Sequence, residues 1–287
     1  MKEQIFVLNN FDNFNPEHIF ECGQCFRWNK ETDGSYTGVF LENVLNVKKE
    51  EKRITFQGMC EDNIIKVITE YFDMNTDYTK MKERLKNTDE YIRAAIEYGS
   101  GIRILKQDLW ETIISFIISA NNNIPRIKGI IERISKKYGE KVVWKEKEYY
   151  TFPTPQQLKD VTIEDFRKLG AGFRDKRLHQ TVQKVLQKEI DLDYLKSIED
   201  SQILRQELMK IDGVGEKVAD CIMLFALQKF NVFPVDVWVR RVMNELYIKE
   251  TDETKVNKDK IRKLANQKYS EIAGIAQQYL FYWKREN

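Results

Sequence analysis

The sequence predicts an α+β protein in which a small N-terminal antiparallel sheet packs on a mainly α-helical core. β-Rich segments with a turn signal, Asp33-Gly34, are confined to the first part of the chain. From about residue 76 the apolar pattern becomes helical, and no low-complexity linker separates the two parts. We therefore expect residues 1–78 to form the sheet domain and residues 79–287 to form two helical subdomains that share an interface with it.

Local patterns predict the individual elements. The expected strands have an alternating or β-rich composition and lie at 34–40, 43–50 and 53–58. Residues 108–120 are apolar nearly all round, as expected of a central buried helix. Other helices are indicated by a proline in the first turn, by a capping box or by an apolar helical pattern, at Pro125, at Thr154 with Gln157, near residue 162 and at the C-terminal end of the chain.

The composition indicates an ordinary folded protein and gives no global sign of a partner. Of the 287 residues 42% are hydrophobic, and the net charge is only +2, so any surface for nucleic acid must be local. No apolar run approaches the ~20 residues of a membrane span, and the N-terminus lacks the apolar region of a signal peptide. We expect a cytoplasmic protein without a membrane partner.

The four cysteines, Cys22, Cys25, Cys60 and Cys221, suit a reducing compartment better than a disulfide framework. Cys22 and Cys25 form a CxxC pair, which is typical of redox or half-zinc sites, but no second CxxC and no histidine cluster follows. We therefore expect no catalytic metal and no organic cofactor.

A glycine turn between two helical patterns is the most informative local feature. One helix is expected to end near Ile211 and the next to begin near Glu216, while Gly213 and Gly215 permit the close turn between them. Free backbone N–H groups at the start of the second helix can face a phosphate. Such turns also occur in proteins without a DNA role, so the turn alone is a weak signal.

Two side chains next to this turn allow covalent chemistry. Lys217 lies in the first turn of the second helix, where the positive end of the helix dipole disfavours an ammonium. A solvated or phosphate-contacting lysine is the simpler interpretation, and a nucleophilic amine is the other. Asp236 follows Pro234 and precedes a helical pattern, so we expect it to cap that helix. A carboxylate held there can also stabilise positive charge on a sugar and help to deprotonate the amine.

The motif GVGEK, followed by VADC and PVDV, resembles the helix-hairpin-helix (HhH-GPD) glycosylase superfamily, and the other motifs resemble its 8-oxoguanine DNA glycosylase/AP lyases in a prokaryotic form. The resemblance covers the chain from about residue 20 to residue 281. It implies an HhH-GPD core that excises 8-oxoguanine from double-stranded DNA. Lys217 would attack C1′ of the sugar and form a Schiff base that permits β-elimination, and Asp236 would assist. The resemblance also implies a monomer located at the nucleoid, with a structural cation on the carbonyl oxygens of Met209, Ile211 and Val214.

The resemblance assigns further residues to a pocket for a base flipped out of the duplex. In ECGQCFRW, Gly23 would offer its carbonyl to the N7 hydrogen that 8-oxoguanine has and guanine lacks. In GIAQQYLF, on the C-terminal helix, Gln277 would read the Watson–Crick edge and Phe281 would stack on the base, with Cys221 against the opposite face. The simpler interpretations are a turn glycine, a core helix and a small buried cysteine.

Other motifs resemble the parts of the family that hold the opened duplex. In SANNNIPRI, Asn121 would fill the gap and Arg126 would read the estranged base, while GAGFRDKR places Phe173 as a wedge beside Arg174. Phe173 replaces a usual tyrosine and Trp238 a usual histidine, which leaves the opposite-base preference and the phosphate contacts open. The remaining expected DNA contacts are those of the hairpin, at Gly213 and Gly215.

Two other functions stay open on the sequence alone. A glycosylase for other oxidised or alkylated bases would carry the same hairpin and lysine, and a non-catalytic lesion-binding protein would carry the hairpin as a backbone grip. Mass spectrometry of the released bases distinguishes the first alternative from an 8-oxoguanine glycosylase. Borohydride trapping on lesion DNA distinguishes the second from an enzyme that forms a covalent adduct.

Overall fold

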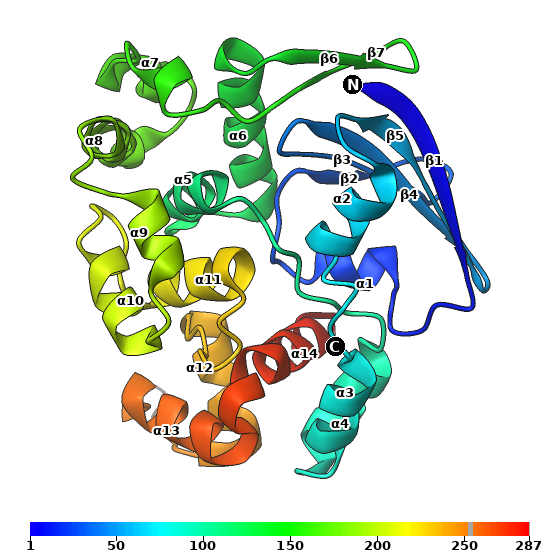
Figure 1. Cartoon of the computed structure of the whole chain (residues 1–287). Coiled ribbons are helices and arrows are strands. Elements are labelled where there is room, and N and C mark those ends of the chain that lie inside the picture. The colour runs from blue at the N-terminus through cyan, green and yellow to red at the C-terminus, as the bar shows by residue number, and fades with distance from the viewer. Residues whose placement is uncertain (252–254, 287) are drawn as a thin grey trace.

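The computed structural model describes residues 1–251 and 255–286 and has the α+β architecture that the sequence predicts. Figure 1 shows an N-terminal sheet beside a larger body of helices. The sheet has five antiparallel strands in the order β1-β5-β4-β3-β2. The strands are β1 (Lys2–Asn9), β2 (Trp28–Lys30), β3 (Tyr36–Phe40), β4 (Asn43–Glu50) and β5 (Arg53–Cys60). The three expected strands are confirmed, and the turn at Gly34 has the positive φ of 81° that favours glycine.

Two helices lie within the N-terminal part, where the sequence predicted only strands. They are α1 (Pro16–Glu21) and α2 (Ile64–Tyr71), and the prediction was wrong there. Each begins at an asparagine whose side chain accepts a backbone N–H. Both bury apolar side chains in one cluster with a face of the sheet, where Phe20 stacks on Trp28 with ring centroids 4.0 Å apart. The six-residue α1 has too few turns to give a recognisable apolar period, whereas the buried Ile64, Ile68 and Tyr71 of α2 do follow a helical period.

The helical part contains a hairpin that the sequence did not predict, formed by β6 (Lys141–Trp144) and β7 (Lys147–Tyr150). Its buried Val142 and Trp144 pack with Val39 and Val44 of the sheet in a small separate cluster. The hairpin therefore ties the end of a helix in the second part of the chain to the N-terminal sheet (Figure 1).

The helical core surrounds α5 (Leu109–Ser119), which buries side chains all round and packs against α6, α8 and α11, as predicted for a central helix. Its neighbours and the remaining helices are α3 (Tyr78–Lys86), α4 (Glu90–Tyr98), α6 (Ile124–Tyr138), α7 (Ile163–Lys168), α8 (Asp175–Leu186), α9 (Leu192–Ser197), α10 (Ser201–Met209), α11 (Glu216–Leu227), α12 (Val237–Met243), α13 (Lys258–Tyr269) and α14 (Ala273–Glu286). A π-helical turn, Asn244–Ile248, follows α12. The C-terminal helix α14 packs against α4, α12 and α13.

Two predicted helix starts have different outcomes. Pro125 lies in the first turn of α6, as expected, after Asn123 as the N-cap. Thr154 and Gln157 exchange the reciprocal hydrogen bonds of a capping box, at 2.8 and 3.2 Å, but the segment forms only a 3₁₀ turn, Gln156–Leu158. The box is therefore present without the α-helix that it predicted.

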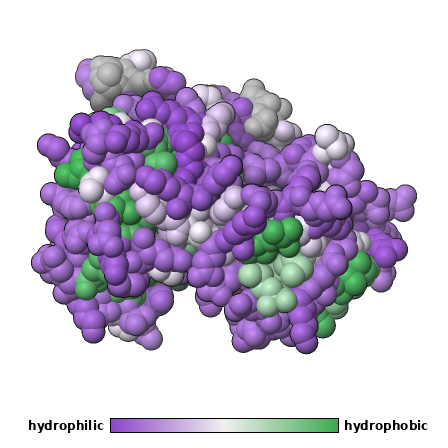
Figure 2. Space-filling view, turned by 90° about the horizontal axis from the view of Figure 1, so that it is seen from above, coloured by the Kyte–Doolittle hydropathy of each residue, from purple (hydrophilic) through white to green (hydrophobic). Residues whose placement is uncertain are grey.

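The surface is mainly polar on the face seen in Figure 2, where hydrophobic residues form separate patches among hydrophilic ones. Within the described ranges, none of the helices combines the length and the apolar character that a bilayer span requires.

Candidate active site

The two helices predicted on either side of the glycine turn are present, with α10 ending at Met209 and α11 beginning at Glu216. Gly213 has a positive φ of 91°, and a β-carbon there would lie 2.8 Å from Cδ of Arg177. Gly215 has an extended backbone, and a β-carbon there would meet open space. Of the two glycines of this turn, only Gly213 has a backbone conformation that favours glycine. At Gly215 the first amides of α11 lie on an exposed surface that a phosphate can approach.

Lys217 lies in the first turn of α11 and is half-buried. Its Nζ lies 5.5 Å from the ring centroid of Phe116 on α5, a neighbour that the sequence analysis missed. One turn further on, burial raises the pKa of the Cys221 thiol to about 11. The charge of the nearby Lys217 opposes this rise, and the charge of Asp236 adds to it. The thiol is therefore neutral near pH 7. Because both charges act on Cys221, the lysine, the thiol and the Asp236 carboxylate lie in one region.

Asp236 is the N-cap of α12, as predicted. Its Oδ1 accepts a hydrogen bond of 2.8 Å from the backbone N–H of Val239. The preceding residues Pro234 and Val235 are buried, so the strand-like approach to the helix is anchored in the core. This anchoring holds a half-exposed carboxylate at the positive end of a helix, next to the Lys217 region.

The two ends of the chain meet at the predicted base pocket. Gly23 has a positive φ of 83°, and a β-carbon there would lie 3.2 Å from Cε1 of Phe281. Gln277, one turn before Phe281 on α14, is buried and accepts a hydrogen bond of 2.9 Å from Gln278. The structure thus brings Gly23 and Phe281 together. Because the ring already lies against Gly23, a base that enters between them must displace it.

Gln24 fixes the Gly23 turn and was not among the predicted site residues. Its fully buried side chain donates hydrogen bonds of 2.8 Å to the carbonyl oxygens of Ile19 and Arg103, and accepts one of 2.8 Å from the N–H of Leu105. A polar side chain in so apolar a segment is the signal that could have revealed it, because buried amides are kept only where they are hydrogen-bonded.

The predicted duplex-opening residues also come together. Asn121 is exposed, with a positive φ of 51°, and Phe173 is 57% exposed, as a wedge requires. Arg174, however, is only 1% exposed and donates hydrogen bonds of 2.9 and 2.8 Å to the carbonyls of Ala120 and Asn121. Its guanidinium also stacks on the Phe173 ring at 4.1 Å. Arg174 therefore holds the Asn121 loop, whereas Arg126 is exposed beside it.

Two other expected features lie at the edges of the site. Trp238 is exposed in the first turn of α12, two residues after Asp236, and its role in DNA binding stays a prediction. Within the hairpin, the Ile211 carbonyl accepts a 3.0 Å hydrogen bond from the N–H of Val214. The cation expected on the carbonyls of this turn also stays a prediction.

The Cys22–Cys25 pair lies directly behind the Gly23 turn. Both are buried free thiols, and burial raises the pKa of Cys22 to about 12 and that of Cys25 well above its ordinary range. Both side chains pack in the core, and Cys22 also donates a 3.2 Å hydrogen bond to the carbonyl of Ile19.

A separate cavity of about 650 Å³ lies between the sheet and the start of α5, and none of the predicted site residues lines it. It is rich in carboxylates. Burial raises the pKa of Glu111 to about 7, although Arg27, 3.9 Å away, lowers it. A shared hydrogen bond with Glu61 raises the pKa of Glu42.

Two family models match the chain. Residues 7–113 match the 8-oxoguanine DNA glycosylase N-terminal domain, and residues 114–271 match the HhH-GPD superfamily base excision DNA repair protein. Among curated relatives, a probable N-glycosylase/DNA lyase of Methanothermobacter thermautotrophicus is 30% identical over 73% of this chain and 70% of its own length. The N-glycosylase/DNA lyase of Saccharomyces cerevisiae is 29% identical over 92% of this chain and 81% of its own.

Solved structures are similar over the whole chain. An 8-oxoguanine glycosylase/lyase of Clostridium acetobutylicum, in complex with double-stranded DNA containing cytosine opposite 8-oxoguanine, is 43% identical with a TM-score of 0.93. The match covers 100% of this chain and 97% of that one. MBOgg1 in complex with a low-affinity DNA ligand is 40% identical with a TM-score of 0.92, over 100% of this chain and 99% of that one.

Proposed function

Because the chain belongs to the HhH-GPD superfamily of base excision DNA repair proteins, we propose that it excises 8-oxoguanine from double-stranded DNA and then cleaves the strand by β-elimination. The glycosylase/lyase names of its relatives and the match to the 8-oxoguanine glycosylase N-terminal domain support this function. The observation that carries the mechanism is the position of Lys217, which lies directly after the hairpin in one region with Cys221 and Asp236.

The turn between α10 and α11 and the loop at Asn121 hold the opened duplex in this proposal. The N–H groups at the start of α11 bind a backbone phosphate, because they are free at a helix N-terminus and Gly215 leaves the approach open. The exposed ring of Phe173 enters the stack, and Asn121 occupies the space of the flipped nucleotide. Arg126, which is exposed, reads the base left behind.

Lesion recognition depends on Gly23 in this proposal. The carbonyl of Gly23 accepts a hydrogen bond from N7–H of 8-oxoguanine, whereas N7 of guanine is an acceptor and is repelled. Phe281 turns away from Gly23 and stacks on the base, and Gln277 bonds to its Watson–Crick edge. Only a residue without a β-carbon allows this approach, since a methyl group at Gly23 would point into the space between Gly23 and Phe281 that the base enters.

The chemistry begins with the uncharged amine of Lys217. Its nitrogen forms a bond to C1′ while the glycosidic bond breaks, so the base leaves with the bonding electron pair. The carboxylate of Asp236 stabilises the positive charge that develops on the sugar and accepts a proton from the attacking amine. Opening of the sugar ring gives an imine between Lys217 and C1′. The imine acidifies the C2′ proton, and loss of this proton expels the 3′ phosphate.

Borohydride trapping tests this mechanism directly. With duplex DNA containing 8-oxoguanine, borohydride should reduce the imine to a stable covalent adduct in the parent protein, and Lys217→Gln should form none. Lys210→Gln is the matched control, because Lys210 is a lysine of the same hairpin but is paired with Glu207 on the surface. Mass spectrometry should find 8-oxoguanine released by the parent and by Lys210→Gln.

Two outcomes would contradict the proposal. A parent protein that binds lesion DNA but gives neither an adduct nor a free base would be a lesion-binding protein. Release of methylated purines without 8-oxoguanine would instead remove the assignment of Gly23 and Gln277.

A further inference from the structure

A buried carboxylate on the catalytic helix has no role in the mechanism above. Asp220 lies on α11 three residues after Lys217 and is 0% exposed. Taking a carboxylate out of water is unfavourable unless charged partners compensate, so such a group is rarely kept without a purpose. Burial raises the pKa of Asp220, while the neighbouring Arg205 and Arg262 lower it.

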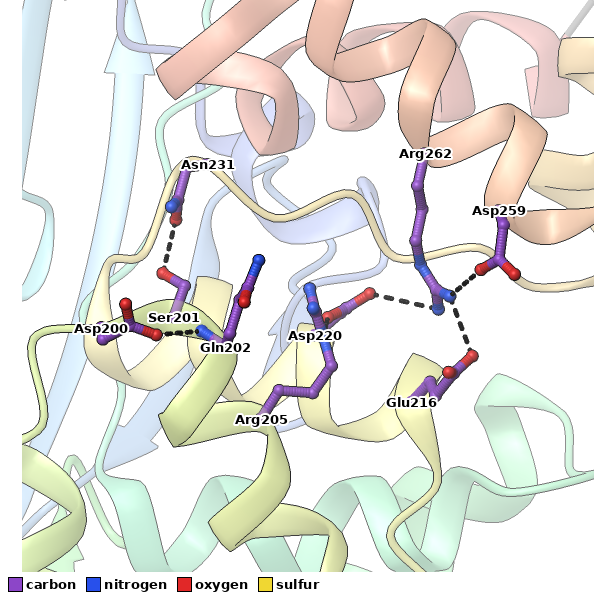
Figure 3. Close-up of polar contacts among 9 residues, drawn as sticks. All are labelled: Asp200, Ser201, Gln202, Arg205, Glu216, Asp220, Asn231, Asp259 and Arg262. Carbon is purple, nitrogen blue, oxygen red and sulfur yellow. Dashed lines mark hydrogen bonds and ion pairs between the residues drawn. The ribbon is translucent and has the colours of Figure 1, made fainter.

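Arg205 and Arg262 approach Asp220 from two different helices. Arg205 on α10 donates a hydrogen bond of 2.7 Å from Nε to Oδ1 of Asp220. Arg262 on α13 places Nη2 3.6 Å from Oδ2, an oxygen that has no hydrogen-bond partner among the described residues. Figure 3 shows Asp220 with Arg205 on one side and Arg262 on the other. The carboxylate thus joins α10, α11 and α13.

Arg262 also holds the first residue of the catalytic helix. Its Nη1 donates a hydrogen bond of 2.8 Å to Glu216, the residue directly before Lys217 (Figure 3). Glu216 and Asp220 are four residues apart and lie on one side of α11, and Lys217 and Cys221 lie on the adjacent side. The arginine therefore fixes two successive turns of α11 next to the side that carries the amine.

The helix needs such support because its own start is weakly fixed. Gly215 is the N-cap of α11, and no side chain caps the helix. A capping side chain would stabilise the first turn and set where it begins. The contacts of Glu216 and Asp220 with neighbouring helices therefore add to the apolar packing of α11 in placing Lys217 relative to the hairpin.

We infer that Asp220, held by Arg205 and Arg262, is a positioning residue that sets where the Lys217 amine lies relative to C1′ of the flipped nucleotide. The inference rests on the proposed function. The physical reason is that nucleophilic attack requires the two atoms within about 3–3.5 Å, and a 1 Å error can cost roughly a hundredfold in rate. Asp220 contacts neither DNA nor the amine in this scheme, so its loss acts on the chemical step.

The test compares Asp220→Asn and Arg262→Met with a matched control, Asp259→Asn. Asparagine keeps the shape of Asp220 and removes its charge, and methionine keeps most of the apolar stem of Arg262. Asp259 contacts the same arginine at 3.4 Å but lies on α13 itself and has a 72% exposed side chain. Asp259→Asn therefore removes a carboxylate from Arg262 without touching the catalytic helix.

Single-turnover excision of 8-oxoguanine, with enzyme in excess, separates positioning from folding. At saturating enzyme its rate constant depends on how the reacting atoms are placed, and it does not change when part of the enzyme is unfolded, as long as the folded enzyme still saturates the DNA. We expect the rate constant to fall about tenfold or more in Asp220→Asn and in Arg262→Met. The dissociation constant for lesion DNA should change less than about threefold, and Asp259→Asn should match the parent.

Specific results would overturn the inference. An unchanged rate constant in Asp220→Asn would do so, and if that variant does not fold, an unchanged rate constant in Arg262→Met would do the same. A loss of DNA affinity as large as the loss of rate would also do so, because it would place the effect in binding. A parent protein that gives no borohydride adduct would contradict the proposed function itself. An active parent with unaffected variants would contradict only the role of Asp220.

Discussion

Asp236 is predicted to have two roles that substitution can separate. As an N-cap, its Oδ1 accepts the Val239 N–H at 2.8 Å, and in the proposed mechanism the same carboxylate supplies negative charge. Asparagine is as good an N-cap as aspartate but carries no charge, whereas alanine can do neither. Asp236→Asn should therefore lose the chemistry alone, and Asp236→Ala should lose the chemistry and the cap.

The expected magnitudes differ by role. Loss of the cap in Asp236→Ala should cost about 1 kcal/mol of the free energy of unfolding, which for a chain of this size lowers Tm by about 2 °C. In Asp236→Asn the Tm should change little. Both variants should excise 8-oxoguanine at least about 100-fold more slowly, as is usual when a positioned acid–base group is removed.

Thermal unfolding and single-turnover excision measure these two effects separately. The excision assay uses a duplex with 8-oxoguanine opposite cytosine and an excess of enzyme, so that product release does not limit the observed rate. An Asp236→Asn variant with the parent rate would refute the catalytic role. If Asp236→Asn were as unstable as Asp236→Ala, the assigned capping bond would be wrong.

Three further predictions follow from the structure. Burial raises the pKa of Glu111 from its ordinary value of 4.5 to about 7 in the folded protein, so the folded state binds the Glu111 proton more tightly than the unfolded state does. The stability that this proton contributes is fully present below pH 4.5 and is lost as the pH rises through 7, a loss of up to about 3 kcal/mol. Glu111→Gln should remove this loss, as measured by urea unfolding at pH 5 and pH 8. Gly23→Ala should weaken binding of 8-oxoguanine DNA about tenfold or more, because the β-carbon, 3.2 Å from the Phe281 ring in the free protein, would fill the space between Gly23 and that ring which the base enters, whereas Gly34→Ala, with a similar positive φ but open space around it, should bind normally. Arg174→Ala should slow excision by the same factor opposite all four bases, since Arg174 holds the Asn121 loop by its carbonyl; a selective loss opposite cytosine would show instead that Arg174 reads the base.

The fold could be predicted where an element carries its own periodic pattern. The central helix α5 is apolar nearly all round, and the segments of β3 to β5 are β-rich or alternating, so both were expected. The short helix α1 and the β6–β7 hairpin were missed because each has too few residues for a period and is stabilised by burial against the sheet, whereas α2 was missed although Ile64, Ile68 and Tyr71 follow a helical period. Val142 and Trp144, for example, lie on a strand whose apolar side chains are buried only because Val39 and Val44 of the sheet pack against them.

The site could be predicted where a role depends on local backbone geometry. Asp236 after a proline, and Lys217 after the glycine turn, lie where the sequence placed them. The contacts of Phe116 and Arg174 could not be predicted, because each joins segments far apart in the chain, and at Gln24 the sequence could signal a buried amide but not its partners. A buried arginine and an exposed one have the same local sequence signals, and only the packed fold shows that Arg174 holds a loop.

The parts of the proposed site divide between chemistry and recognition. Lys217 and Asp236 both lie within residues 114–271, which match the superfamily model, and they depend on the hairpin and on a helix cap. Gly23 comes from the N-terminal part, and Gln277 and Phe281 come from the part of α14 beyond residue 271. The residues that would distinguish one base from another therefore surround the shared core from both ends of the chain. Because Phe281 lies against Gly23, the proposed recognition pocket would form only when these ends meet, whereas Lys217 and Asp236 both lie on helices of the core. Such an arrangement allows the choice of base to change without disturbing the amine that attacks the sugar.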